Sequence, residues 1–318
     1  MIDADDIASV LVPVTVNDGR IVSITAGGVD LPEDSNPMWA PGTTYALGAR
    51  VYSPVTHRVY ESLKAGNVGK DPTQLVNQTT AAGIGTWWYN LGPTNKYAMF
   101  DGLISTQTLA ASPLVIKIRA GASNGMAMFK VDADNVEVGV AAGPGGDTIF
   151  EYDDDMEGSE PADFYEYFFD LFKPKTQLVL TGIEPYSSSE FTITMTKATG
   201  PIKIGMLAFG DLRPLGSTER GAAVEPKTYA YIETDAYGQT RIVQRPSAVG
   251  LVLPIKLDVE DSDSVLETVQ NLLDVPVAVI GSTSPLHTRL STFGLISGSM
   301  RYDEYPYCVL NLTVKGFT

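Results

Sequence analysis

The side chains best suited to chemistry are few in this sequence and lie far apart. His57 and His287 are the only histidines, and Cys308 is the only cysteine. A serine or cysteine nucleophile needs a histidine base that a third group orients, and a zinc site needs several Cys or His ligands at short spacings. The sequence therefore predicts no catalytic residue, no metal site and no cofactor, and we expect a protein that is not an enzyme.

Carboxylates are the one reactive group that is abundant. Asp153 to Glu157 is an acidic run that could hold Ca²⁺ through its oxygens, but it lacks the alternate spacing of an EF-hand and is more typical of a solvated loop. A pair of carboxylates could also cleave a glycosidic bond, and the sequence singles out no such pair. An enzyme that degrades envelope polysaccharide is therefore the weakest of the functional hypotheses.

Charge and hydropathy argue against two kinds of partner. The 318 residues include 22 Lys and Arg against 38 Asp and Glu, which gives a net charge of −16 without any basic cluster. Because nucleic acid carries charge of the same sign, we expect no direct contact with it. No apolar run approaches the ~20 residues that cross a bilayer as a helix, so we expect no membrane span. The acidic N-terminus also lacks the pattern of a secretory signal.

The elements that must position any site are mostly strands, and we expect a mainly β fold. The chain contains 30 Gly, 20 Pro and 15 Tyr, a turn-rich and aromatic composition that favours β-structure. Residues 8–26 resemble two strands, and Asn17-Asp18-Gly19 between them is a hairpin signal. We therefore predict an N-terminal β-hairpin and linker over residues 1–38, followed by a small β domain over residues 39–92.

The rest of the chain predicts two larger units. Between residues 93 and 215, alternating segments such as 190–196 follow one another with few helical gaps, which predicts a β-sandwich or jelly-roll-like body. Residues 216–318 predict an α+β module with one clear helix, because apolar residues recur at helical spacing from Val265 to Leu273. Residues 151–170 carry nine acidic residues and no basic one among several aromatics, so we expect part of this stretch to pack on a sheet or dock on a partner.

The aromatic residues between 39 and 92 stand in a distinctive order. The segment contains Trp39-Ala-Pro-Gly-Thr-Thr-Tyr45, Gly48-Ala-Arg-Val-Tyr52, Arg58-Val-Tyr-Glu-Ser62 and Trp87-Trp88-Tyr89-Asn-Leu-Gly92. This order resembles the small chitin-binding modules of carbohydrate-binding families 5 and 12, whose aromatic faces stack on sugar rings. The resemblance implies a glycan-binding site, with Trp39, Tyr60, Trp87 and Trp88 as its candidate residues.

The same aromatic residues have a second interpretation, as the core of the small domain. A unit of ~50 residues has little else to bury, so Trp39, Tyr45, Tyr60 and Trp87 could form its interior. If residues 87–89 are a strand, Trp87 and Trp88 point to opposite faces. One tryptophan is then core while the other is exposed, and we expect Trp88 to be the exposed one.

A wider resemblance covers roughly residues 36–318. Its most specific part, Leu91-Gly-Pro-Thr-Asn-Lys-Tyr-Ala-Met-Phe-Asp101 followed by Ser105-Thr-Gln-Thr108, resembles a signature of tailed-bacteriophage virion proteins. It implies a structural component of a tail tip, baseplate or collar, made in the bacterial host cytoplasm and resident in the virion tail. The implied partners are other tail proteins and further copies in a symmetric homo-oligomer.

The small aromatic domain supplies the alternative function. Under that hypothesis the chain is a receptor-binding protein that holds a host surface polysaccharide on residues 39–92. The two functions are compatible, because a structural tail protein can display a sugar-binding domain.

Overall fold

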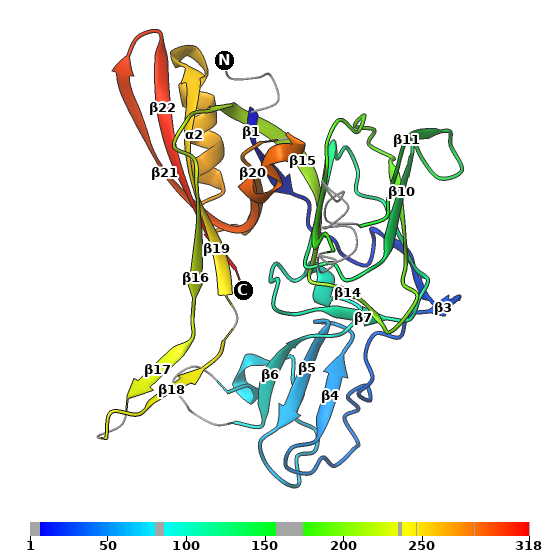
Figure 1. Ribbon diagram of the computed structural model, residues 1–318. Coiled ribbons are helices and arrows are strands. Elements are labelled where there is room, and N and C mark those ends of the chain that lie inside the picture. Colours follow the sequence, from blue (N-terminus) through cyan, green and yellow to red (C-terminus); the bar gives the residue numbers. More distant parts are fainter. Residues whose placement is uncertain are drawn as a thin grey trace, which may run out of the picture.

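The computed structural model describes residues 7–79, 86–156, 174–234, 237–245, 247–282 and 284–317. Its fold is mainly β, as the sequence predicts, and the described strands form several antiparallel sheets (Figure 1). Two large sheets build the body, and three smaller ones lie at its margins.

The larger of the two main sheets has nine strands in the order β12-β9-β15-β1-β20-β21-β22-β19-β16. Their bounds are β1 Ile7–Pro13, β9 Gly125–Phe129, β12 Gln177–Leu180, β15 Met206–Thr218, β16 Ala223–Thr228, β19 Ser247–Asp258, β20 Val277–Ile280, β21 Ser291–Glu304 and β22 Tyr307–Gly316.

The second main sheet has six strands in the order β11-β10-β13-β8-β2-β3. Their bounds are β2 Ile21–Ala26, β3 Val29–Asp30, β8 Leu114–Ile118, β10 Asn135–Ala141, β11 Thr148–Asp154 and β13 Glu190–Thr196.

The remaining elements are short. One small sheet contains β4 (Arg50–Ser53), β5 (Arg58–Ser62) and β6 (Trp88–Pro93), a second pairs β7 (Thr108–Ala110) with β14 (Ile202–Ile204), and a third pairs β17 (Tyr231–Thr234) with β18 (Thr240–Val243). The helices described are α2 (Ser262–Asn271) and 3-10 turns at Leu75–Asn77, Ala98–Phe100, Val259–Asp261 and Pro285–Leu290.

The six-stranded sheet packs on one end of the nine-stranded sheet, and a single hydrophobic core fills the space between them. The alternation in β13 places Phe191, Ile193 and Met195 on the inner face, where all three are fully buried. Phe191 meets Phe209 of β15 edge to face, with 5.1 Å between ring centres. This is the sandwich expected for the middle of the chain, because period-two burial leaves one face of each strand for the opposing sheet.

Helix α2 covers the other end of the nine-stranded sheet (Figure 1). Val265 and Val269 pack there among strand residues such as Leu253 and Leu310. The predicted helix is confirmed. It begins at Ser262, and its N-cap residue, Asp261, makes no side-chain capping bond. The apolar spacing identified the helix because it reports the buried face, which is independent of how the first turn is capped.

The predicted N-terminal hairpin is wrong. Strand β1 pairs with β15 and β20 in one sheet, whereas β2 pairs with β8 and β3 in the other. The backbone N–H of Arg20 donates to the carbonyl of Asn17 (2.9 Å), so Asn17-Asp18-Gly19 does form a turn, but the turn carries the chain between two sheets. The division into 1–38, 39–92, 93–215 and 216–318 stays a prediction, and β15 runs across its last boundary.

Candidate functional site

The three-stranded sheet β4-β5-β6 is attached to the body through a neck that centres on His57, in the turn between β4 and β5. The imidazole stacks on Tyr97 with 3.7 Å between ring centres, and its Nδ1 lies 3.0 Å from Glu33 Oε1. The N–H of Thr94 donates to the His57 carbonyl (2.8 Å). Burial, together with a hydrogen bond to Asp18, raises the pKa of Tyr97 well above its ordinary value of 10. These contacts hold both ends of the small domain against the body.

Inside the domain, the aromatic residues form a core. Trp88 and Tyr60 are fully buried, and Tyr45 packs edge-on against Trp88 with 5.4 Å between ring centres. The Trp88 Nε1–H donates to the carbonyl of Lys70 (2.7 Å), which satisfies the one polar group of the indole. A buried ring with a saturated N–H has no face left for a ligand.

The four predicted sugar-binding residues therefore come together, but they do not form one exposed platform. All four belong to or pack against the same cluster. The expectation that Trp88 is the exposed tryptophan is wrong, because its exposure is 0%. Trp39 and Trp87 are partly buried, and the Nζ atoms of Lys64 and Lys70 lie 5.0 and 5.5 Å from the centre of the Trp87 ring. Of the predicted set, only Trp39 and Trp87 retain surface that a sugar could reach.

Tyr89, which is not among the predicted residues, is the most exposed aromatic residue of this sheet, with an exposure of 50%. Tyr89 lies across from Glu61 on β5, and Glu61 accepts a charged hydrogen bond from Arg50 Nε (2.9 Å) on β4. An aromatic face beside fixed polar groups is what recognition of a sugar requires. The alternation that buries Trp88 would have identified Tyr89, once the inner face of the sheet was known.

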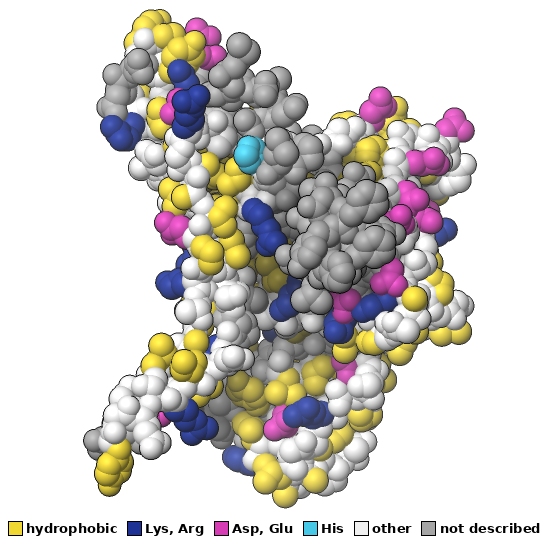
Figure 2. Space-filling view, viewed as in Figure 1, with side chains coloured by type: hydrophobic (Ala, Val, Ile, Leu, Met, Phe, Trp, Pro, Cys, Tyr) yellow, Lys and Arg dark blue, Asp and Glu magenta, His cyan; other side chains and the backbone are white. Residues whose placement is uncertain are grey.

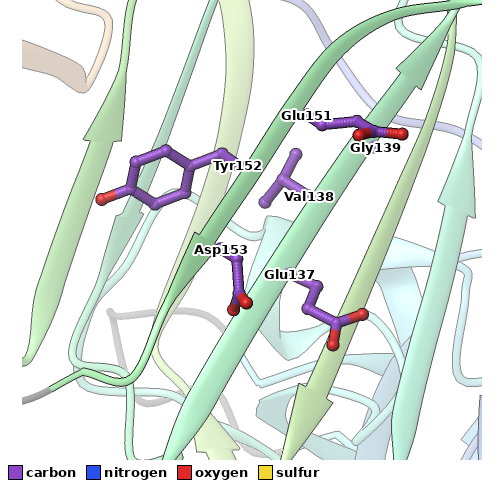
Figure 3. Close-up of a pocket in the computed structure, with 6 residues that line it drawn as sticks. All are labelled: Glu137, Val138, Gly139, Glu151, Tyr152 and Asp153. Atoms are coloured by element: carbon purple, nitrogen blue, oxygen red, sulfur yellow. The ribbon is translucent and has the colours of Figure 1, made fainter.

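A second surface of interest is the outer face of β10 and β11. Glu137, Glu151 and Asp153 line a hollow of about 380 Å³ there, and Tyr152 points the other way (Figure 3). Glu137 lies directly across from Asp153 in the strand register. Like charges in that position destabilise a sheet. Among the described strands, β11 forms one edge of the six-stranded sheet and pairs only with β10.

The neighbouring Asp154 faces a different environment. Burial alone would raise the pKa of this carboxyl, but hydrogen bonds from Lys175 Nζ (2.9 Å), the Tyr152 hydroxyl and the Met156 N–H outweigh it and lower the pKa. Within the described ranges, no three His, Cys, Asp or Glu side chains are arranged to hold a metal ion. Residues 157–170 of the predicted acidic and aromatic stretch lie outside the described residues.

The third surface is a β-hairpin that projects from the body, which we call the arm and define as β17, β18 and the turn between them (Figure 1). Every residue of its two strands is exposed. Ile232 and Ile242 lie across from each other on one face, with exposures of 64% and 61%. The opposite face presents Tyr231 beside Val243. The arm thus carries apolar side chains on both faces with no covering layer in the described structure.

The segment Gly121-Ala-Ser-Asn-Gly125 has the spacing of a nucleophile elbow, in which the serine is exposed for attack on a substrate. Ser123 is fully buried, and its hydroxyl donates to the carbonyl of Ala120 (3.0 Å). A hydroxyl that is sealed from substrate and committed to a carbonyl does not act as a nucleophile.

Comparison of the chain with protein-family models, curated proteins and solved structures finds no match. In the described part of the chain, no helix has the length and apolar character needed to cross a bilayer.

Proposed function

We propose that this chain is a structural subunit of a bacteriophage tail tip, baseplate or collar, and that it works by assembling in several copies. The observation that carries the assembly role is the arm, which places Ile232, Ile242, Tyr231 and Val243 outside both large sheets. A two-stranded hairpin is at best marginally stable alone in water, and contiguous apolar surface of this kind marks a protein interface. The virion setting rests on the resemblance of residues 91–108.

Mass spectrometry of purified virions tests the proposal, with sedimentation of the purified chain as its companion. We expect the chain among the virion proteins at several copies per particle, and an oligomer in solution. A chain that sediments as a monomer and is missing from virions would contradict the proposal.

A second function, attachment to a host surface glycan, is favoured by one observation on the small domain. Tyr89 presents an exposed ring next to the Arg50–Glu61 ion pair. Such a face can stack on a pyranose ring while charged groups bond its hydroxyls. A structural subunit could carry this activity without any change in its assembly.

The test of the second function is a titration with chitin oligosaccharides, read by tryptophan fluorescence and by calorimetry. Tyr89→Ala should abolish any binding, whereas Val55→Ala, in the exposed turn between β4 and β5, should leave it unchanged. Binding that survives Tyr89→Ala and is lost with Trp87→Ala would move the site from Tyr89 to Trp87. If the native chain does not bind these oligosaccharides, the second function is excluded.

A further inference from the structure

The base of the arm contains a hollow of about 390 Å³ whose charge differs from that of the chain as a whole. Tyr229 of the arm base, Phe317 and Leu103 give it an apolar lining, and Arg245 and Lys315 are the charged residues on its wall. The chain carries a net charge of −16, yet no carboxylate lines this hollow among the described residues. The hollow therefore offers an apolar surface with two positive charges beside it.

These two cations have no partner in the described structure. In the sandwich, Arg119 lies 3.4 Å from Glu190 and Lys175 lies 2.9 Å from Asp154. The side chains of Arg245 and Lys315, by contrast, form no ion pair or hydrogen bond with any described residue, and both are exposed. Two cations held beside apolar walls without an acid are suited to receive a carboxylate-bearing segment.

The same chain offers such a segment at the β10–β11 edge. Glu137, Glu151 and Asp153 share the outer face of these strands, and no cation lies among the residues that line their hollow (Figure 3). Acidic side chains gather on this side of the molecule in the space-filling view (Figure 2). The cost of placing Glu137 across from Asp153 is offset once positive charge covers them.

In Figure 1 the arm and β11 point to opposite sides of the molecule, and the C-terminus, next to Phe317 of the hollow, lies between them. The two hollows share no lining residue and lie on separate strands of the folded chain, so their contact forms between two copies. A contact between different patches of identical subunits is heterologous, and its repetition gives a closed ring or an open filament. Rings of this type suit the symmetric assembly proposed above, on which the present inference rests.

We propose that the acidic β10–β11 edge of one copy docks in the hollow at the arm base of the next, with Arg245 and Lys315 facing Glu137, Glu151 and Asp153. The arm then lies along the docked edge, and this contact covers Ile232 and Ile242 of the arm. Apolar contact supplies the affinity of this interface, and the opposite charges fix its register and direction.

Charge reversal tests the inference with the full chain. The first variant, Arg245→Glu with Lys315→Glu, makes the hollow acidic, and the second, Glu137→Lys with Glu151→Lys, makes the edge basic. Each alone should weaken association roughly a hundredfold, because like charges across an interface cost several kcal/mol. All four residues are exposed, so both variants should unfold at the native midpoint. Lys130→Glu, an exposed cation at the end of β9, is the matched control and should associate normally.

The decisive sample is an equimolar mixture of the two reversed variants, examined by analytical ultracentrifugation. Each contact between the two variants joins an acidic hollow to a basic edge or a basic hollow to an acidic edge, so association should return. The quadruple variant should likewise associate by itself. Raising the salt concentration should weaken the native assembly.

The inference and the proposed function fail in different ways. If the native chain forms oligomers that neither reversal affects, or if the mixture stays dissociated, the docking inference is overturned and assembly stands. If the native chain is monomeric but virions contain it, the partner of the hollow is not a second copy of this chain, and the tail role stands. A chain that is monomeric and missing from virions overturns both.

Discussion

Two of the three small sheets, β4-β5-β6 and the arm, differ in where their apolar side chains point. The domain that contains β4, β5 and β6 turns its large aromatic residues inward, so that Trp88 and Tyr60 are fully buried. The arm turns its apolar residues outward on both faces, and Ile232 and Ile242 remain more than half exposed. The first unit has a core of its own, whereas the second has none.

This difference indicates where each unit finds its stabilising contacts. The small domain has a core that the chain itself supplies, and this core leaves the ring of Tyr89 on the outer face. A hairpin without a core depends on what it docks against. We therefore expect substitutions in the small domain to change the free energy of unfolding, and substitutions in the arm to change association.

The largest effect should come from the centre of the small domain. Trp88→Ala removes a fully buried indole and leaves the carbonyl of Lys70 without its donor, so we expect the domain to lose ~3–5 kcal/mol of stability. Chemical denaturation followed by tryptophan fluorescence measures it. Tyr89→Ala, one position along the same strand, should cost about 0.5 kcal/mol or less. Equal losses from the two substitutions would contradict the core described for this domain.

The next effect should appear in the arm, and only in association. Replacing both Ile232 and Ile242 by Thr keeps β-branched residues in the ribbon but removes apolar surface. We expect association to weaken by ~2 kcal/mol, about thirtyfold, with no change in unfolding of the monomer. Sedimentation equilibrium measures the association. Val55→Thr, which is exposed in the small domain, is the control, and a similar loss from it would deny the arm any special role.

A smaller effect is expected at the neck between the small domain and the body. His57→Asn keeps a residue that tolerates the positive φ of 52° but removes the ring stacked on Tyr97. The stack and the contact with Glu33 should be worth ~1 kcal/mol together. Faster proteolysis at the neck, with an unchanged core of the small domain, is the expected result. An unaltered rate of proteolysis would show that the backbone hydrogen bonds of the neck are enough to hold the small domain against the body.

The smallest effect concerns pH and lies in the body. A hydrogen bond from Lys197, with a further one from Lys203, lowers the pKa of Asp132 below its ordinary value of 3.8. The ion pairs therefore stabilise the fold above pH 3.8, and this contribution is lost as the pH falls through the lowered folded pKa. Because Asp132 is 43% exposed, Asp132→Asn should cost only ~0.5 kcal/mol near neutral pH and nothing in strong acid. A constant difference at all pH values would exclude this charge effect.

The sequence predicted those elements whose pattern reports a buried face. Segment 190–196 alternates because β13 has one face in the sandwich core, and the apolar spacing around Val265 and Val269 marks the face of α2 that packs on the sheet. The hairpin between β1 and β2 failed because both edges of β1 are occupied by strands far along the chain. A local turn signal carries no information on such long-range pairing.

The candidate site was predicted only in part. The sequence brought Trp39, Tyr60, Trp87 and Trp88 into one domain, but it could not say which face of β6 is the inner one. That choice depends on Tyr45 and on the Lys70 carbonyl, which come from other segments. The arm gave no pattern at all, because a ribbon exposed on both faces has no alternation of buried and exposed residues.

Electron cryomicroscopy of intact virions can show whether the arm is the assembly element. We predict density for this chain in several symmetry-related copies in the tail, with each arm covered by the β10–β11 edge of its neighbour. Virions without the chain would contradict the assembly role. Copies whose arms extend into solvent, with no contact to a neighbouring subunit, would contradict the assignment of the arm as the assembly element.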